Sequence, residues 1–192
     1  MKKVIIIGAG GNIARKVTDM LLNKTEIDLS LFLRNSSYLK VTENSRCHIV
    51  QGDVMNYEVL KNAVSGKDIV YVNLAGNLEA MAKNIVSAMK ETGVKRVIFI
   101  SSIGIYDTPV KSVLQPYRKA TDVFERSGLE YTILRPSWFT SADEVHYEIT
   151  KKGEHEKGSG ISQKSLASFI VKIIETPDEY INANLGINKP WS

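Results

Sequence analysis

Cysteine is nearly absent from this chain, and its scarcity excludes two kinds of stabilising centre. Cys47 is the single cysteine, so no disulfide can form within the chain and a cage of several thiolates around a metal is excluded. His146 and His155 lie near several glutamates, but their spacing does not place two ligands on one helix face. We therefore expect no metal site.

Long apolar runs and one-sided charge are lacking as well. The run Val4–Ile7 ends at Gly8, too soon for a signal core or a membrane span. The 25 basic and 21 acidic residues leave a net charge of +4, and the two signs are interleaved along the chain. This pattern does not indicate nucleic acid binding, whereas it suits a small anionic ligand. We expect a cytoplasmic protein that binds neither nucleic acid nor membrane.

The chain contains enough apolar residues for a substantial core in one domain. It has 192 residues, of which 43% are hydrophobic and 24% charged, with no linker, repeat or low-complexity segment. We therefore treat residues 1–192 as one domain. Short apolar runs recur, each followed by a loop signal. They are Val4–Ile7, Ile27–Leu33, His48–Gln51, Ile69–Leu74, Val97–Ser101 and Tyr131–Leu134.

Helical spacing separates most of these runs. Apolar residues recur at helical intervals from Ile13 to Leu21 and from Met81 to Met89, and further helices are predicted over 113–126 and 164–174. Gly93 follows the second of them, as a glycine beyond a helix end should. Nearly continuous apolar strands alternating with helices predict an α/β fold, a doubly wound parallel sheet with helices on both sides. In such a sheet a ligand binds beyond the carboxyl ends of the strands, at the topological switch point.

The first strand runs directly into the segment Gly8-Ala9-Gly10-Gly11-Asn12-Ile13-Ala14, and a helix follows without a break. The free N–H groups at such a helix start can hold a pyrophosphate. We therefore expect the cofactor to contact five residues of this segment, namely Gly8, Gly10, Gly11, Asn12 and Ile13. The alternative is an ordinary glycine-rich turn between a strand and a helix.

This segment resembles the Gly-x-x-Gly-x-x-Gly pattern of short-chain dehydrogenases, with Ala14 in place of the third glycine. Later segments resemble the NmrA-like and flavin-reductase-like members of the atypical class, over about three quarters of the chain. They are Gly52-Asp53-Val54, Asn73-Leu74-Ala75-Gly76, Ser101-Ser102-Ile103-Gly104-Ile105-Tyr106, Tyr131-Thr132-Ile133-Leu134-Arg135-Pro136 and Gly160-Ile161-Ser162.

The end of the second predicted strand favours NADP over NAD. An NAD site usually places an acid there, about twenty residues past the glycines, whereas this chain has Arg34 followed by Asn35. A guanidinium can pair with a 2′-phosphate through two hydrogen bonds. The alternative is a solvent-exposed arginine at a strand end.

The resemblance adds further cofactor contacts. It implies that Asp53 and Val54 flank the adenine, and that the segment Leu74, Ala75, Gly76 touches the cofactor. Asp53 has a second interpretation as the cap of a helix that begins near Asn56.

The tyrosine and lysine pair of catalytic short-chain dehydrogenases, spaced four apart, is missing from its expected helix. Tyr117 and Lys119 are two apart, and Gln115 stands four residues before the lysine. Two pairs elsewhere have the right spacing, and we interpret both as chance surface pairs. They are Tyr57 with Lys61 and Tyr147 with Lys151.

The resemblance to flavin and biliverdin reductases, which work without that pair, implies other site residues. Ser102 matches the serine that these reductases keep after the fifth strand, although its hydroxyl can equally satisfy the loop backbone. Tyr106 is a candidate for the acceptor side or a loop anchor with its hydroxyl in water. Ser101, Lys119 and Pro136 are expected beside the cofactor.

Two later segments are open to interpretation. Trp138 and Phe139 can form the floor of a flat pocket, but aromatic residues after a strand more often join the core, which we favour. The segment Ser141–Gly160, rich in Glu, Lys and Gly, is expected to be a loop or lid. His48 is expected to pack inside its strand beside Cys47.

Two functions follow from these residues. The first is an NADPH-dependent oxidoreductase that passes hydride to a small, flat conjugated acceptor of the flavin or quinone type. The second is an NADP(H)-binding redox sensor of the NmrA-like type, which the missing pair favours. We expect a monomer or homodimer in either case.

Overall fold

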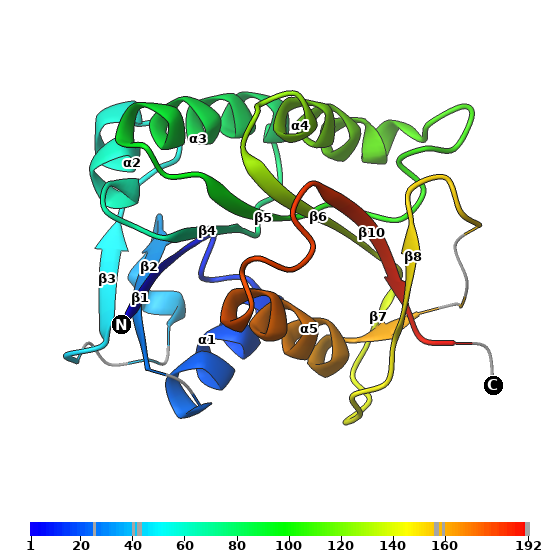
Figure 1. Cartoon of the computed structure of the whole chain (residues 1–192), viewed down its shortest axis with the longest axis horizontal. Coiled ribbons are helices and arrows are strands. Elements are labelled where there is room, and N and C mark those ends of the chain that lie inside the picture. The colour runs from blue at the N-terminus through cyan, green and yellow to red at the C-terminus, as the bar shows by residue number, and fades with distance from the viewer. Residues whose placement is uncertain (25, 40, 42–43, 156–157, 159, 191–192) are drawn as a thin grey trace.

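The computed structural model describes residues 1–24, 26–39, 41, 44–155, 158 and 160–190. Among these residues, eight strands form one sheet in the order β3-β2-β1-β4-β5-β6-β10-β8 (Figure 1). The strands are β1 (Lys2–Ile7), β2 (Ile27–Leu33), β3 (Cys47–Gln51), β4 (Ile69–Val72), β5 (Arg96–Ile100), β6 (Glu130–Pro136), β8 (Glu148–Lys151) and β10 (Ala183–Asn188). Neighbouring strands pair in parallel except β8, which pairs antiparallel to β10.

The predicted doubly wound sheet is confirmed. All six predicted strands are present, with small differences at their ends, and the order reverses between β1 and β4. The carboxyl ends of β1 and β4 therefore border the switch point, where a ligand is expected. β8 and β10 were not predicted, and they extend the sheet beyond β6.

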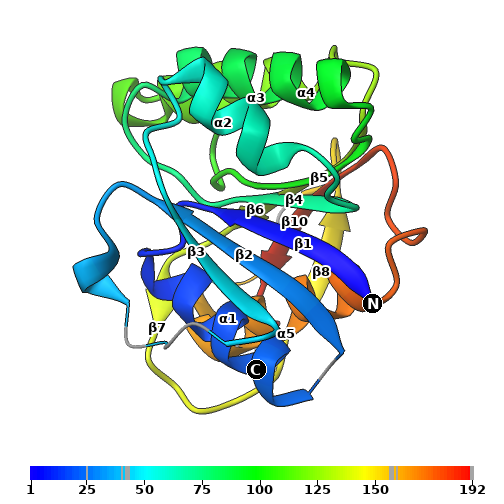
Figure 2. The ribbon, with the colours of Figure 1, turned by 90° about the vertical axis from the view of Figure 1, so that its left-hand side faces the viewer.

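Helices cover both faces of the sheet. On one face lie α1 (Asn12–Lys24) and α5 (Gln163–Glu175), and on the other lie α2 (Tyr57–Val64), α3 (Leu78–Thr92) and α4 (Gln115–Glu125), as Figure 2 shows end-on. Gly93 ends α3 in the left-handed conformation with φ of 74°, as predicted. Short 3₁₀ turns, η1 (Ser36–Tyr38) and η2 (Ser112–Leu114), follow β2 and precede α4.

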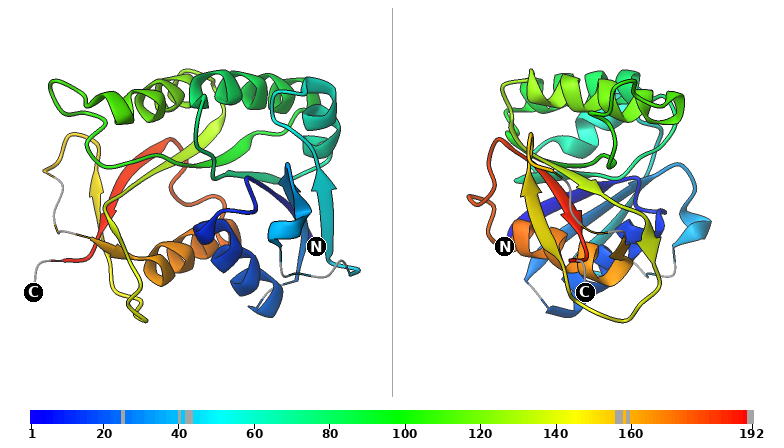
Figure 3. Two further views of the ribbon diagram at one scale, coloured as in Figure 1. Left: turned by 180° about the vertical axis from the view of Figure 1, so that it is seen from behind. Right: turned by 90° about the vertical axis from the view of Figure 1, so that its right-hand side faces the viewer.

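The segment Ser141–Gly160, which was expected to be a loop or lid, contains one strand, and part of it is hydrogen-bonded to neighbouring elements. It contains β8, at the far end of the sheet (Figure 3). Its first half is held against α5 and the chain end: the Ser162 hydroxyl donates to the carbonyl of Glu144 at 2.8 Å, and the Lys189 ammonium reaches the Glu144 carboxylate at 2.9 Å. These bonds argue against a freely closing lid over residues 143–146. Two short strands, β7 (Phe139–Thr140) and β9 (Ile161–Ser162), pair in parallel beside it.

The expectation that His48 packs within its strand is wrong. Cys47 is buried, whereas the His48 side chain is 50% exposed and its Nε2 lies 3.3 Å from Asp28 Oδ1. Successive side chains of a strand point to opposite faces, so His48 does not share the face on which Cys47 is buried. β3 is also an edge strand, with no further strand of the described chain beside it to cover His48.

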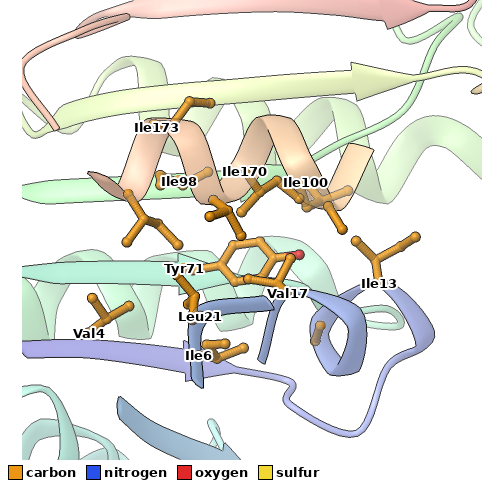
Figure 4. Close-up of a cluster of buried hydrophobic side chains, with 14 of the residues drawn as sticks. Val4, Ile6, Ile13, Val17, Leu21, Tyr71, Ile98, Ile100, Ile170 and Ile173 are labelled. Atoms are coloured by element: carbon orange, nitrogen blue, oxygen red, sulfur yellow. The ribbon is translucent and has the colours of Figure 1, made fainter. Parts of the chain in front are cut away.

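The core consists of two apolar clusters, one on each face of the sheet. Tyr71 of β4 lies in the cluster beneath α1 and α5, with Val17, Leu21 and Ile170 around its ring (Figure 4). Its side chain is fully buried, and its hydroxyl has no hydrogen-bond partner among the residues that the structure describes. Burial raises the pKa of this hydroxyl far above its usual range, so it stays neutral. An unpaired buried hydroxyl costs stability.

We therefore predict that Tyr71→Phe stabilises the protein. Removing the unpaired hydroxyl without changing the ring should raise the free energy of unfolding by about 1 kcal/mol and Tm by roughly 2–4 °C. Thermal unfolding followed by circular dichroism measures this. Tyr147→Phe, on a half-buried ring at the rim of the same cluster, is the control and should change Tm little. A lower Tm for Tyr71→Phe would show that the hydroxyl is hydrogen-bonded.

Candidate functional site

The glycine segment after β1 lies against the segment that follows β4. Gly8 has φ of +87°, and a Cβ on it would lie 2.1 Å from the carbonyl oxygen of Asn73. A Cβ on Gly11 would lie 2.8 Å from the side-chain nitrogen of the same asparagine. A side chain at Gly8 is excluded by both strain and space, so the two loops can approach only through glycine. The predicted switch-point crevice is therefore bordered by backbone at Gly8 and by the Asn73 side chain at Gly11.

The start of α1 offers backbone donors to this crevice. The first i to i−4 bond runs from the N–H of Arg15 to the carbonyl of Gly11 at 2.9 Å, so the amides of Asn12 and Ile13 precede the hydrogen-bonded ladder. The first turn has no acidic residue. Its positive dipole end is thus uncompensated and suits a pyrophosphate. Gly10 is half-buried beside it, and Ala14 is buried, which permits the close helix packing predicted for it.

The end of β2 presents positive charge to solvent. Arg34 is exposed immediately after the strand. Asn35 is also exposed, and its side-chain oxygen accepts from the N–H of Ser37 at 3.0 Å, which caps η1. The amide N–H groups of the Asn35 side chain remain available to a ligand. The predicted contact through Asn35 is therefore limited to those donors.

Arg15 is a basic residue of this region that sequence reasoning missed. Its Nη2 donates to Asn12 Oδ1 at 2.6 Å, and it lines a hollow of about 360 Å³ together with Leu39 and Val41, which follow η1. The hollow joins the start of α1 to the chain just beyond β2. Its position in the sequence could have identified it, because Arg15 is the first basic residue after the glycines.

The segment after β3 contradicts one alternative for Asp53. The cap of α2 is Asn56, whose side chain accepts from the N–H of Val59 at 3.4 Å, while Asp53 Oδ1 accepts from the N–H of Met55 at 2.8 Å. Asp53 therefore shapes the preceding turn and does not cap the helix. It remains exposed at the carboxyl edge, whereas the neighbouring Val54 is only 5% exposed.

The segment after β4 is open where a cofactor is expected. Ala75 and Gly76 are exposed, and Gly76 has φ of +103° with nothing near the position of a Cβ. Leu74 is half-buried and packs against the cluster under α2, α3 and α4. The backbone of this segment is therefore accessible beside the glycine turn.

The two serines after β5 face different surroundings. Ser101 is buried, and its hydroxyl lies 2.9 Å from that of Thr121 on α4, so its side chain does not face the cofactor edge. Ser102 is half-buried, and its hydroxyl donates to the carbonyl of Ile103 at 3.1 Å. The structure thus shows the backbone-satisfying role that was an alternative for Ser102. Thr121 occupies the position four residues after Tyr117, where a catalytic pair would have lysine.

Lys119 lies on the outer surface between two helices. Its ammonium is 3.4 Å from Glu79 Oε2 of α3, and its side chain is 59% exposed. Its predicted reach toward the cofactor ribose would require this ion pair to break. In this arrangement Lys119 links α4 to α3.

Of the two tyrosine and lysine pairs with catalytic spacing, the interpretation as a surface pair is wrong for Tyr147, whose half-buried ring packs against Phe169 in the core. The Tyr57 hydroxyl donates to Glu91 at 2.5 Å, and this bond is the main cause that raises its pKa to about 12. A proton-relay tyrosine needs the opposite shift. Lys151 lies on the strand β8, so its spacing from Tyr147 does not bring the two together as it would on a helix.

Tyr106 lies in a cluster of charged residues between α4 and the far strands of the sheet. Its hydroxyl accepts from the Asn184 amide at 2.7 Å and is 3.5 Å from Glu125 Oε1. Three cations lie against its ring, Arg118 at 4.7 Å, Lys152 at 4.9 Å and Arg135 at 5.4 Å from the centroid. Arg135, which is 1% exposed, also donates to Asn184 Oδ1.

This cluster changes the interpretation of Tyr106. The hydroxyl is engaged by Asn184 and Glu125 and does not face water or the crevice. Burial, followed by the charge of Glu125, raises its pKa despite Lys152 and Arg135. Tyr106 therefore anchors the loop after β5, and the structure does not support a catalytic role for it.

The chain beyond β6 is exposed at the same carboxyl edge. Pro136 is buried, and its carbonyl accepts from the N–H of Ile103 at 3.1 Å, which ties the loops after β5 and β6 together. Trp138 is 79% exposed and Phe139 48% exposed. The expectation that these rings join the core is wrong. The small pair β7 and β9 holds their backbone at the surface instead of turning it back over the sheet.

The described part of the chain offers neither a metal site nor a membrane span. No group of three or more His, Cys, Asp and Glu side chains there is arranged to hold a metal ion. None of the helices described has the length and apolarity that crossing a membrane requires.

Known proteins resemble this chain over most of its length. A family model described as NAD(P)H-binding matches residues 8–177. The structure of a Rossmann-fold NAD(P)-binding family protein from Shigella flexneri is 44% identical with a TM-score of 0.93, covering 100% of this chain and 95% of that one. A short-chain dehydrogenase/reductase from Veillonella parvula in complex with NADP is 27% identical with a TM-score of 0.90, covering 98% and 95%.

A curated relative is similar over part of its length. Phenylcoumaran benzylic ether reductase PT1 from Pinus taeda is 27% identical over 157 residues, covering 71% of this chain and 49% of the reductase. The chain spans about half the length of several such relatives.

The Tyr106 cluster predicts a pH-dependent contribution to stability from Glu125. Burial alone would raise the pKa of Glu125, but hydrogen bonds from Lys152 and Asn184 and the charges of Lys152 and Arg118 hold it below its ordinary value of 4.5. A depressed folded-state pKa contributes stability above the ordinary value, and this is lost as pH falls through the folded pKa.

Glu125→Gln should therefore lower the free energy of unfolding at pH 7 by roughly 1 kcal/mol or less, given solvent screening. The deficit should shrink as pH falls below 4.5, the ordinary value. Urea unfolding at pH 7 and pH 4 measures it. Glu58→Gln, in a surface pair with Lys61, is the control and should show little change at either pH. An equal deficit at both pH values would mean that shape, and not charge, is responsible.

Proposed function

We propose that this chain, which belongs to the NAD(P)H-binding family matched over residues 8–177, is an NADPH-dependent oxidoreductase that reduces a flat conjugated acceptor. The chain has the Rossmann fold of its NAD(P)-binding structural neighbours, and its predicted resemblance to atypical short-chain dehydrogenases is confirmed. The acceptor type, flavin or quinone, is the part that we infer from the site. The observation that carries the proposal is the glycine-built crevice between β1 and β4, with Arg34 at its adenosine end.

The crevice residues fit a dinucleotide. At Gly8 only backbone can approach the segment after β4, the Asn73 side chain lies against Gly11, and the amides of Asn12 and Ile13 lie at the positive end of α1. The adenosine half would extend over β2 and β3, past Arg34. The nicotinamide half would extend over β4, β5 and β6.

Two features favour NADP as the cofactor. No acid stands at the end of β2 to accept from a ribose 2′-hydroxyl, and Arg34 is exposed there instead. Arg15 lines the adjoining hollow and can add a second guanidinium near a 2′-phosphate. A relative that is 27% identical was solved in complex with NADP, which is consistent with this preference.

The acceptor side supports flavin or quinone reduction. NADPH, when bound, supplies a hydride from its nicotinamide ring, and such acceptors can take the accompanying proton from water. The protein then needs to align two flat rings and to exclude competing groups. That is consistent with Lys119 being paired with Glu79, Ser101 with Thr121, and Tyr106 with Asn184. Each of these three groups is engaged with another side chain and does not stand ready for the proton transfer that carbonyl reduction needs.

The cofactor preference predicts the effect of Arg34→Glu. The change removes a guanidinium and adds repulsion against a 2′-phosphate, so NADPH affinity should fall on the order of thirtyfold, about 2 kcal/mol. NADH affinity should stay nearly constant. Titration calorimetry with both nucleotides measures it, and Arg126→Glu, an exposed position after α4, is the matched control. Equal losses for NADPH and NADH would contradict the assignment of Arg34.

Turnover tests the reductase function itself. Stopped-flow mixing of the protein and NADPH with FMN, menadione or dichlorophenolindophenol should show catalysed loss of NADPH absorbance. Tight NADPH binding without turnover across this panel would contradict the enzyme and favour the alternative, a redox sensor. The missing tyrosine and lysine pair is the observation that keeps that alternative open.

A further inference from the structure

We propose that Trp138 is the surface on which the flat acceptor stacks, an inference that rests on the reductase function proposed above. The indole is 79% exposed, and the neighbouring Phe139 ring is 48% exposed. Exposing two large aromatic side chains in succession leaves apolar area in water that folding alone would have buried. A ligand of matching shape would remove that area from water.

The position of Trp138 in the sheet suits an acceptor next to the nicotinamide. It follows Pro136, the last residue of β6, at the carboxyl edge that also carries the glycine turn. In the order β1-β4-β5-β6, the end of β6 is three strand spacings from β1, or roughly 14 Å. The nicotinamide half of a dinucleotide bound at α1 must extend in this direction, because Arg34 and Asp53 occupy the other. Trp138 would therefore lie toward the nicotinamide end of a dinucleotide bound in this way.

The backbone that carries Trp138 is held on both sides. The carbonyl of Trp138 accepts from the N–H of Ile161 at 2.8 Å, and Phe139 pairs with Ile161 in the small sheet of β7 and β9. The N–H of Ser137, just before it, donates to the carbonyl of Ile187 on β10 at 3.4 Å. Gly160 lies close against the same carbonyl, where a Cβ would be 3.2 Å away. The ring is thus exposed on a fixed support, which reduces the entropy lost when a ligand stacks on it.

The chemistry of the position matches a conjugated ring. An indole offers a broad π face, and stacking of a flat ring on an aromatic side chain strengthens binding on the order of tenfold. Val113, which is 70% exposed on η2 in the loop after β5, adds apolar surface at the same edge. A flat acceptor of the flavin or quinone class is the occupant that we infer.

Tryptophan fluorescence tests the stacking directly. The chain has two tryptophans, so Trp191→Phe leaves the emission of Trp138 alone. With NADP⁺ present to prevent turnover, FMN or menadione should quench this emission along a saturable curve. Quenching that is linear in quencher and equal to that of free N-acetyltryptophanamide is collisional, and it would overturn the proposal.

Turnover separates this proposal from the reductase function. Trp138→Ala should raise KM for the acceptor about tenfold, with NADPH affinity unchanged, and Trp138→Phe should restore most of the loss. Ile181→Ala, which removes exposed apolar surface just before β10, should change neither value. Wild-type turnover combined with an unchanged KM in Trp138→Ala would overturn the stacking role and leave the reductase function standing.

Two further results decide the remaining cases. Saturable quenching without turnover would support the stacking site and overturn the reductase function. An emission of Trp138 that shifts with protein concentration, and not with acceptor, would assign the ring to an interface between copies and overturn the proposal.

Discussion

The contact between Gly8 and the carbonyl of Asn73 is the constraint on which the rest of the site depends. It joins the turn after β1 to the segment after β4 at the point where the strand order reverses. Only a residue without a Cβ can make this approach, because a Cβ on Gly8 would lie 2.1 Å from the carbonyl oxygen of Asn73 and the φ of Gly8 is +87°. The contact sets where α1 begins, and therefore where its open amides point.

The two halves of the carboxyl edge are built differently. On the cofactor side, from β3 to β4, the binding groups are backbone amides and exposed basic side chains. On the acceptor side, from β5 to β10, polar side chains are engaged with one another, as Tyr106 is with Asn184 and Glu125. A site of this kind can position flat rings through backbone and apolar contacts, but it offers few free groups for proton transfer. This division agrees with a reductase whose acceptor takes its proton from water.

The sequence predicted the parts of the fold that local chemistry determines. The six parallel strands and the glycine turn are visible because buried strands are nearly continuous in apolar residues and because a tight turn needs glycine. β10 was missed because its sequence Ala-Asn-Leu-Gly-Ile-Asn mixes apolar residues with asparagines. Those asparagines are buried on the face opposite the cluster beneath α1 and α5, and there Asn184 pairs with Arg135 and Tyr106. No local sequence pattern predicts these pairings, because Arg135 is 49 positions and Tyr106 is 78 positions from Asn184.

The site was predictable to the same extent. The glycines, Arg34 and the segment 74–76 lie where expected, because strand ends in a parallel sheet meet at one edge. The surroundings predicted for the side chains after β5 and β6 were less accurate. Whether Ser101, Tyr106 or Trp138 faces the core or the solvent depends on tertiary neighbours, namely Thr121, Asn184 and β9.

Titration calorimetry of NADPH on the purified protein and on Gly11→Val tests cofactor binding at the glycine turn most directly. The wild type should show a single site for NADPH and the variant should lose it, because a side chain at Gly11 would meet the Asn73 side chain and occupy the space expected for the pyrophosphate. The absence of binding heat with NADPH or NADH on the wild type at millimolar concentrations would contradict it. Unchanged affinity in a folded Gly11→Val would do the same.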